Sequence, residues 1–463
     1  MEKRQIIILF LAVMVLSISC EMGTAPDLPL SPVSVETVGL SDSAILIRWT
    51  DISANEDSFL VRRSMYPDFS TVDFEMDVPA DTEIYRDKYN IIPNEEYFYE
   101  VCTVKDGYIA SACEVLYVET GDASPSPQAG QLVADHTVVN MIKNGEIPVS
   151  AITDAKNDLH IAYGHTSHGS QIISGMVGLA AFANAGNCDG GEEYSLTPDL
   201  FSWSHAAEAG SLHLYEGDGY GTGDLDHDCG YFSEGYTRQE YIDAVAAYDP
   251  EDPESTRPRN WEHETRIYLG DPVNGYGSNH TEINVIIWSW CGQASDGNHN
   301  TLAGMTLRYF EPMETLEAEY YNIDFVYMTG HLNRNGQAHA GNELIRAYCE
   351  ENDKWLFDFA DIESYDPDGI PYSSGGLSSS DSCIYDFNGN GTIEIQEGSE
   401  TIPENGDRNW AMDWQDDHTM FNYEPGQPAD WYNCGAAHSV SINSNMKAYA
   451  AWWLWCRIAG WIG

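Results

Sequence analysis

The hydrophobic pattern of the chain changes once, and this change limits the possible folds more than any other feature. Between residues 33 and 121, apolar and polar residues alternate in short runs such as 44–49 and 97–101. This alternation is typical of half-buried strands. From residue 132 to 463, apolar strand-like runs alternate with helical stretches, which predicts an α/β domain with a parallel sheet. Residues 122–131, with a Ser-Pro repeat, predict a stiff linker between the two domains.

The first domain carries the signature of one β-sandwich family. Ile91, Pro93 and Tyr97 fit the pattern L-x-P-x-x-x-Y, and Trp49 lies in the second predicted strand. The segment 33–121 therefore resembles a fibronectin type III domain. The resemblance implies that Trp49 is the core tryptophan and that Tyr97 forms the tyrosine corner. Such a module serves as a spacer or a weak binding domain, and no group in it suggests catalysis.

The N-terminus predicts export from the cytoplasm. A short charged start precedes an apolar run at 6–15, which is too short for a comfortable transmembrane helix. Ser19 directly before Cys20 resembles the lipobox of bacterial lipoproteins. The resemblance implies that residues 1–19 are a signal peptide, that Cys20 is lipidated, and that residues 20–32 form a tether. The protein is then expected at the cell surface or in the periplasm; ordinary secretion is the alternative.

The cysteines fit an extracytoplasmic location, where disulfides persist. Cys102 and Cys113 lie on two predicted neighbouring strands of the first domain and could bridge a hairpin. The second domain holds an odd number of cysteines, so we expect at least one of them to be free. No cysteine spacing there matches a zinc site.

The charge of the chain excludes some partners. It has 74 acidic and 21 basic residues, which gives a net charge of −53. Binding to DNA or RNA needs clustered Lys and Arg, so we expect no nucleic-acid partner. For the same reason, the lipid anchor at Cys20 is the only membrane attachment that we expect. Since 43% of the residues are hydrophobic, the chain can build real cores and is not a disordered acidic tail.

Four apolar runs of the second domain predict parallel strands that end in polar groups. The strand runs are 159–163, 285–290, 325–328 and 355–359, and the clearest helical stretches are 171–185, 340–352 and 443–459. Functional groups in such a sheet gather at the C-terminal ends of the strands. Ser167, Gln293 and His331 each follow a predicted strand, so we expect the active site at this edge.

Ser167 lies in a Gly-flanked turn between the first of these strands and a helix. A hydroxyl there points into the cleft at the positive end of the helix dipole. Backbone amides of Ser167 and Gly169 could stabilise an oxyanion. This predicts a nucleophile; the alternative is that Ser167 only caps the helix. A serine nucleophile needs a base, and the best candidate is His438, just before the last predicted helix.

The order of these pieces resembles the SGNH (GDSL-type) hydrolase superfamily. Residues 163–172 are similar to its serine block, and residues 290–293 stand where its Gly-x-Asn block is expected. The site residues that this resemblance implies are the nucleophile Ser167, the base His438 and the oxyanion-binding Gly292 and Gln293. We therefore expect a multidomain protein, a β-sandwich followed by a three-layer α/β domain with a parallel sheet.

The resemblance implies a surface-anchored serine esterase that deacylates, for example deacetylates, a carbohydrate or another ester substrate. Gly435 stands where the family has the acid of its triad, so Asp430, Asp386 or a backbone carbonyl could be the third member. The alternative function is a non-catalytic, calcium-stabilised surface protein that binds a glycan or a protein partner. A third reading, metal-dependent hydrolysis at His165 and His168, has no carboxylate partner that the sequence identifies.

Residues 386–397 fit a calcium-binding loop. They match the twelve-residue pattern D-x-[DN]-x-[DN]-G-x5-E at every specified position. The expected ligands are the side chains of Asp386, Asn388 and Asn390, the carbonyl of Thr392 and the bidentate carboxylate of Glu397. The chain has one copy of this loop and no evident flanking helices. We therefore expect a structural calcium site and not a sensor; the alternative is an Asn-Gly-rich surface loop.

Overall fold

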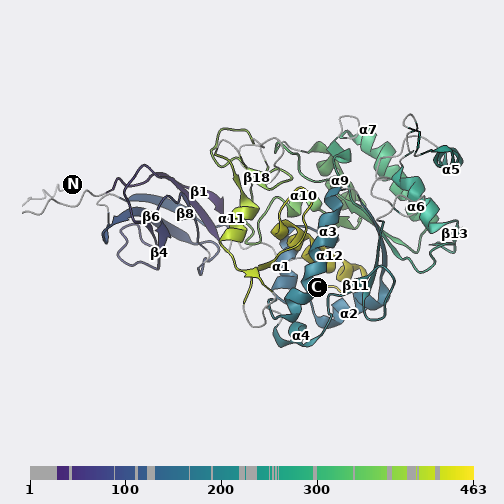
Figure 1. Cartoon of the computed structure of the whole chain (residues 1–463), viewed down its shortest axis with the longest axis horizontal. Coiled ribbons are helices and arrows are strands. Elements are labelled where there is room, and N and C mark those ends of the chain that lie inside the picture. The colour runs from purple at the N-terminus through teal and green to yellow at the C-terminus, as the bar shows by residue number, and fades with distance from the viewer. Residues whose placement is uncertain are drawn as a thin grey trace, which may run out of the picture. The chain divides into compact units, whose positions relative to one another are not determined.

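The computed structural model contains two compact units, which are described separately below (Figure 1). It describes residues 29–40, 44–87, 89–109, 113–121, 131–165, 167–188, 191–217, 225, 237–249, 251–252, 255, 258, 260–295, 300–336, 339–372, 378–393, 403, 406–422 and 428–463. The predicted signal peptide, the predicted lipidation site Cys20 and most of the predicted linker lie outside these residues. In the part of the chain described, no helix is both long and apolar enough to cross a membrane.

The first unit is a β-sandwich, as the sequence predicts. One sheet has the order β1 (Val33–Leu40), β2 (Ile45–Thr50), β5 (Ile84–Asp87). The other has the order β4 (Phe74–Pro79), β3 (Ser58–Ser64), β6 (Glu96–Lys105), and β6 also pairs with β7 (Tyr108–Ile109) and β8 (Glu114–Glu119). In its core, the buried Trp49 ring lies 5.4 Å from that of Phe59, and Tyr97 is also buried.

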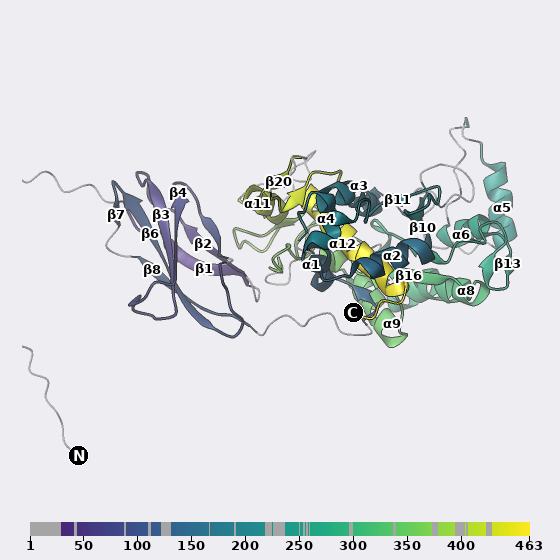
Figure 2. The same ribbon diagram turned by 90° about the horizontal axis from the view of Figure 1, so that it is seen from below.

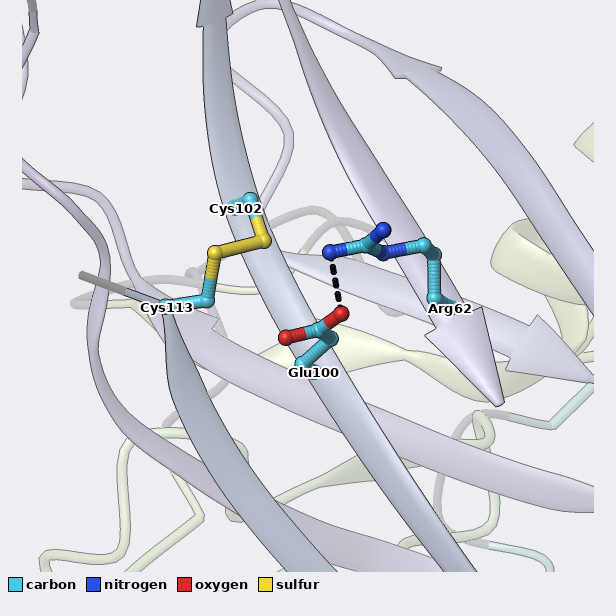
Figure 3. The surroundings of a disulfide bond; sticks show 4 residues. All are labelled: Arg62, Glu100, Cys102 and Cys113. Atoms are coloured by element: carbon cyan, nitrogen blue, oxygen red, sulfur yellow. Dashed lines mark ion pairs between the residues drawn. A yellow bond between two sulfur atoms is a disulfide. The ribbon is translucent and has the colours of Figure 1, made fainter. Parts of the chain in front are cut away.

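A disulfide joins Cys102 of β6 to Cys113, which directly precedes β8 (Figure 3). This confirms the expected bridge. Beside it, Arg62 of β3 forms an ion pair with Glu100, the residue directly opposite on β6. The covalent bond and the ion pair together cross-link three neighbouring strands, β3, β6 and β8.

The second unit is built on a parallel sheet with the strand order β11-β12-β10-β15-β16-β17-β9, in which every pairing is parallel. The strands are β9 (Val133–Ala134), β10 (His160–Gly164), β11 (Trp203–Ser204), β12 (Leu212–Glu216), β15 (Val285–Trp288), β16 (Asp324–Met328) and β17 (Leu356–Phe357). The chain runs from β10 outward to β12 and then returns to β15 on the other side of β10. A ligand crevice is expected at such a reversal of strand order, at the C-terminal ends of β10 and β15.

Helices cover both faces of this sheet. Among them, α2 (Val149–Asp158) packs on β12 and α12 (Ser441–Ile458) on β17 and β9, whereas α8 (Glu311–Glu319) and α9 (Ala340–Glu351) pack on β16. Figure 2 shows α2 and α12 on one side of the sheet and α8 and α9 on the other. The α/β class and the four strands predicted from the sequence are thus confirmed.

The remaining elements are short or peripheral. They are η1 (His136–Val138), α1 (Val139–Lys143), η2 (Ser167–Gly169), α3 (Ser170–Asn184), α4 (Gly191–Leu196), α5 (Arg238–Ala247), α6 (Trp261–Leu269), η4 (Gln293–Ser295), α7 (Leu302–Met305), the π-helical η5 (Thr306–Phe310), α10 (Phe359–Ile362) and α11 (Trp410–Asp416). Three two-stranded ribbons complete the unit: β13 (Pro272–Val273) with β14 (Tyr276–Gly277), β18 (Ile384–Tyr385) with β19 (Arg408–Asn409), and β20 (Met420–Phe421) with β21 (Trp431–Tyr432).

Helix α12 forms much of the core of the second unit. Trp452, Trp453 and Trp455 are almost completely buried. Its N-terminal half lies against α3, and both views show the two helices together (Figures 1 and 2). A Cβ atom added to Gly175 of α3 would lie 2.0 Å from the carbonyl oxygen of Ser444, so only glycine allows this close approach. Helix α12 therefore fixes α3, and with it the turn that carries Ser167.

Candidate active site

Two neighbouring strands deliver the candidate active-site residues to one edge of the sheet. Gly164 at the end of β10 lies opposite Trp288 at the end of β15. The chain then continues to Ser167 and His168 after β10, and to Cys291 after β15. The Tyr163 hydroxyl donates to the Gly169 carbonyl, 2.8 Å away, and so closes the turn that contains Ser167 and His168. The two strand ends therefore place these side chains together.

The centre of the site is a chain of contacts through the buried His168 ring. His168 Nδ1 lies 3.2 Å from the Cys291 sulfur, and His168 Nε2 lies 3.4 Å from Asp381 Oδ2. The thiol is therefore on one side of the imidazole and the carboxylate on the other. This is the order of nucleophile, base and orienting acid found in activated-nucleophile sites.

A second histidine approaches the same thiol. His331 Nε2 lies 3.6 Å from the Cys291 sulfur, and His331 Nδ1 donates to the carbonyl of Leu332 at 2.5 Å. The His168 ring stacks on His331, with centroids 3.8 Å apart, and on His438, with centroids 4.3 Å apart. His168 is thus the middle ring of a three-imidazole stack.

This geometry shifts the titration of both members of the Cys291–His168 pair. Burial would raise the pKa of the Cys291 thiol, but hydrogen bonds from His168 and His331 lower it to about 4. Burial would lower the pKa of His168, but Asp381 and Cys291 raise it to about 9. Between these two values the pair consists of a thiolate and an imidazolium, and a thiolate is the reactive form of cysteine.

The carboxylate behind His168 is ionised. Burial would raise the pKa of the Asp381 carboxyl, but His168 and His331 hold it below its usual value. Its Oδ2 also lies 4.0 Å from His331 Nδ1. Asp381 therefore stabilises the positive charge of His168 and also lies close to His331.

The structure brings Ser167 and His438 into this cluster but joins them differently from the predicted pair. Ser167 is exposed, and its hydroxyl lies 3.6 Å from the Cys291 sulfur. His438 is half-buried and stacks on His168. Among the described residues, no hydrogen bond joins Ser167 to His438. Both residues thus lie at the predicted edge, where the His168 ring contacts the Cys291 thiol.

The predicted oxyanion residues lie directly after the thiol. The side-chain oxygen of Gln293 accepts a hydrogen bond from the backbone amide of Cys291, 2.7 Å away, and so shapes the loop that presents the sulfur. Gly292 is exposed beside it. An oxyanion role for Gly292 and Gln293 stays a prediction.

Both aspartates predicted as the third triad member have other partners. Asp430 accepts from the backbone amide of Thr419, and Asp386 accepts from those of Asn390 and Gly391. Asp381, which the sequence did not single out, is the carboxylate that reaches the cluster. It lies in a loop without hydrophobic periodicity. The positions of Cys291 and His331 directly after predicted strands were the signal for those two residues.

The two histidines considered for metal-dependent hydrolysis face different acids. His165 Nε2 lies 2.9 Å from Glu216 Oε1 at the end of β12, whereas His168 faces Asp381. Nε2 of the exposed His205 lies 3.7 Å from the other carboxylate oxygen, Glu216 Oε2. His165 and His168 therefore do not converge on one point.

His168, Cys291 and His331 could together hold a metal ion, since one ligand atom from each lies within 4.8 Å of the others. Two imidazole ligands of a tetrahedral zinc ion have ring centroids about 5 Å apart. The rings of His168 and His331 instead stack at 3.8 Å, an arrangement in which the two rings contact each other face to face. The observed geometry therefore fits a thiolate–imidazolium pair better than a zinc site.

The predicted calcium loop is described from Asp386 to Ile393, and Glu397 lies outside the described residues. The carboxylate of Asp386 accepts from the amides of Asn390 and Gly391, at 3.0 and 2.8 Å, and the side-chain oxygen of Asn390 accepts from the amide of Thr392, at 2.8 Å. Gly391 has φ +81°, a left-handed conformation that favours glycine at the sharp turn of such loops. Calcium binding stays a prediction.

No family model matches the chain, and no curated protein matches it in sequence. Solved structures of small β-sandwich domains do match. A fibronectin type III domain of human contactin 1 is 22% identical, covering 24% of this chain and 92% of that chain with a TM-score of 0.20. The third fibronectin type III domain of the human KIAA0343 protein is 14% identical, covering 24% and 97% with a TM-score of 0.20.

Proposed function

We propose that the second unit is an acyl hydrolase with Cys291 as its nucleophile and His168 as its general base and acid. The observation that carries this proposal is the placement of the His168 ring between the Cys291 sulfur, at 3.2 Å, and Asp381, at 3.4 Å. The site lies where the strand order reverses, which is where parallel α/β sheets bind ligands. The reaction class is the one that the sequence predicts, but the nucleophile is a thiolate in place of the Ser167 hydroxyl.

The proposed reaction has two steps. The Cys291 thiolate attacks the ester carbonyl, and the tetrahedral intermediate collapses to a thioester as the alcohol leaves with a proton from His168 Nδ1. Neutral His168 then takes a proton from a water molecule, and the hydroxide attacks the thioester. The carboxylic acid is released, and the thiolate and the imidazolium are restored.

The neighbouring residues have supporting roles in this proposal. Asp381 orients His168 and stabilises its positive charge, as the acid of a triad does. The exposed Ser167 hydroxyl, 3.6 Å from the sulfur, is placed to donate to the oxyanion that forms on the attacked carbonyl.

The substrate proposed is an acylated carbohydrate or another ester, handled at the cell surface or in the periplasm by a lipid-anchored protein. The support for this is the N-terminal sequence, the predicted spacer role of the first unit and the order of the serine, glycine and histidine segments around the sheet. The same sequence features support the rival function, a calcium-stabilised surface protein that binds a glycan or a protein partner without catalysis.

Hydrolysis of a fluorogenic acetyl ester by the full chain tests the proposal. Cys291→Ala should reduce kcat/KM by at least about a hundredfold, since it removes the nucleophile. The variant Ser167→Ala removes only a proposed oxyanion donor and should reduce it by less than Cys291→Ala does. A covalent acetyl adduct on Cys291, detected by mass spectrometry after a rapid acid quench, would identify the thioester. Loss of activity in Ser167→Ala, with Cys291→Ala still active, would show that the serine is the nucleophile.

A serine nucleophile is the second candidate, because the exposed Ser167 hydroxyl lies at the same edge of the sheet. A fluorophosphonate probe separates the two, since it labels an activated serine. A zinc chelator is the control for metal-dependent hydrolysis, and activity is expected to remain in its presence. Absence of ester hydrolysis, together with absence of labelling by the fluorophosphonate probe, would favour the binding function.

A further inference from the structure

A buried pair of charges lies beneath the candidate active site. Lys447 of α12 and Glu363, which follows α10, have side chains with 0% exposure, and Lys447 Nζ lies 2.8 Å from Glu363 Oε2. Lys447 Nζ also lies 3.6 Å from the centroid of the Phe359 ring. Taking two charges out of water is unfavourable unless further hydrogen bonds satisfy both groups. The partners of these further hydrogen bonds indicate what the pair holds in place.

One line of hydrogen bonds leads from Glu363 to the loop after β16. Glu363 Oε1 accepts from the backbone amide of Leu332. The carbonyl of the same Leu332 accepts from His331 Nδ1 at 2.5 Å. The carboxylate therefore holds the backbone of Leu332 at its amide, and the carbonyl of the same residue orients the His331 ring toward the Cys291 sulfur.

The other line leads from Lys447 to the loop before α12. Lys447 Nζ donates to Gln171 Oε1, and Gln171 Nε2 donates to the carbonyl of Ala437, each at 2.5 Å. Ala437 precedes His438, which has a left-handed backbone with φ +61°. A non-glycine residue holds this conformation only where its surroundings fix it, and the Gln171 hydrogen bond is one such contact.

We propose that Lys447 and Glu363 are positioning residues that hold His331 and His438 on either side of His168. The outer two rings of the stack belong to the two loops that this ion pair anchors, one through Glu363 and one through Lys447 and Gln171. By fixing both loops, the pair keeps the Cys291–His168 contact in its reactive geometry. The inference rests on the proposed reactive thiolate but does not require turnover of any substrate.

The charge of Glu363 also acts on the site directly, since it helps to raise the pKa of His168. The other ionisable or polar groups that face the Cys291–His168 pair come from every loop around it. They are Ser167, His331, Asp381 and His438. Neutralising Glu363 removes one of the negative charges that favour the imidazolium, so His168 should lose its proton at lower pH. The midpoint of the thiolate, in contrast, depends on how closely His168 and His331 are held to the Cys291 sulfur.

Alkylation of Cys291 in the folded full chain tests the inference. The rate of iodoacetamide labelling of Cys291, read by peptide mass spectrometry between pH 3 and pH 10, gives the pH midpoint of the thiolate. Glu363→Gln keeps an acceptor for the Leu332 amide and removes the charge. Lys447→Met with Glu363→Gln removes both charges together, so that neither is left unpaired in the core. We expect the midpoint to rise by about one unit in each, which is a tenfold change in the thiol–thiolate equilibrium.

Two further variants keep the outcome interpretable. Gln171→Met leaves the ion pair in place but removes the hydrogen bond to the Ala437 carbonyl, and it should shift the midpoint by a smaller amount. If circular dichroism shows that the charge variants do not fold, the midpoint of Gln171→Met tests the inference. Arg266→Met with Glu262→Gln removes an ion pair of α6, whose two side chains are also largely buried, and should leave the midpoint unchanged. A wild-type midpoint in every folded variant of Gln171, Lys447 and Glu363 would overturn the inference.

The result separates this inference from the proposed function. A shifted midpoint in a chain that hydrolyses no ester would support the positioning role and refute the hydrolase. Ester hydrolysis that depends on Cys291, together with an unshifted midpoint in the folded variants, would support the hydrolase and refute the positioning role.

Discussion

The two units use cysteine in opposite ways. In the β-sandwich, Cys102 and Cys113 are joined covalently and cross-link two strands. In the α/β unit, the structure describes at least five free thiols, as expected for at least one of the cysteines; they are Cys291, Cys349, Cys383, Cys434 and Cys456. Burial raises the pKa of Cys349, Cys383, Cys434 and Cys456. Cys291 differs because imidazoles surround it, so the neighbours of a thiol, and not its burial alone, decide whether it is inert or reactive.

The largest expected effect is a contrast in labelling among the free cysteines. At pH 6, Cys291 should be almost wholly thiolate, whereas the four thiols with raised pKa are protonated, and all of them except the half-buried Cys434 are buried. Iodoacetamide should therefore label Cys291 more than about a thousandfold faster, even though a low pKa reduces the nucleophilicity of each thiolate by about a hundredfold. Peptide mass spectrometry of the native protein measures the rates. Uniform slow labelling would remove the contrast between Cys291 and the other thiols.

Reduction of the disulfide should affect only the β-sandwich. The bridge joins residues separated by 11 positions, and a loop of this size contributes about 2–3 kcal/mol to stability by restricting the unfolded chain. Cys102→Ala with Cys113→Ala should lower the free energy of unfolding of the first unit by this amount in urea titrations. The rate of Cys291 alkylation serves as the control and should stay at the wild-type value. A change in that rate would contradict the separation of the two roles of cysteine.

Calcium should stabilise the α/β unit as the disulfide stabilises the sandwich. At a concentration a hundred times its dissociation constant, calcium would add about 2.7 kcal/mol to the stability of a site present only in the folded state. Thermal unfolding with calcium or with a chelator measures this, and Asp386→Ala should abolish the difference. Asp430→Ala is the matched control, because it removes an aspartate outside the loop. Equal melting temperatures with and without calcium would leave residues 386–393 as a plain surface loop.

The smallest expected effect is that of the carboxylate behind His168. Asp381→Asn removes the charge that raises the pKa of His168, so the alkaline limit of Cys291 reactivity should fall from about 9, whereas the acid limit should stay at or below about 4. The sign follows from the charges: without the carboxylate the imidazolium loses its proton at lower pH, and the thiolate loses a neighbouring negative charge that opposes its formation. Ester hydrolysis at pH 7 should decrease about tenfold. The matched variant Asp430→Asn should leave both limits in place.

The sequence predicted the architecture because local patterns determine it. The continuous apolar run at 285–290 became the fully buried strand β15, and the stretch at 443–459 became α12, shifted by one or two residues at its ends. The alternating runs of the first unit became the strands of the sandwich, with Trp49 and Tyr97 buried as expected. Each of these outcomes depends on residues that are neighbours in the chain.

The sequence predicted where on the sheet the candidate site lies, but not which of its residues contact one another. Ser167 and His438 were found because each adjoins a predicted helix, and both lie at the expected edge of the sheet. His168 was considered for metal-dependent hydrolysis, whereas it contacts Cys291, which follows the neighbouring strand β15. Asp381 had no local signal at all. The pairings depend on loop conformations that bring distant residues together, and no periodicity encodes those.

Helix α12 determines when the candidate site can form during synthesis of the chain. His438 and Lys447 lie in or directly before this helix, so the ribosome makes them after every other component of the cluster. Until they are in place, Cys291 belongs to an incompletely folded chain, in which a thiol has its ordinary pKa of about 8.5 and is mostly protonated near neutral pH. A nascent chain would thus carry a mostly protonated thiol, and reactivity would begin only when folding is complete.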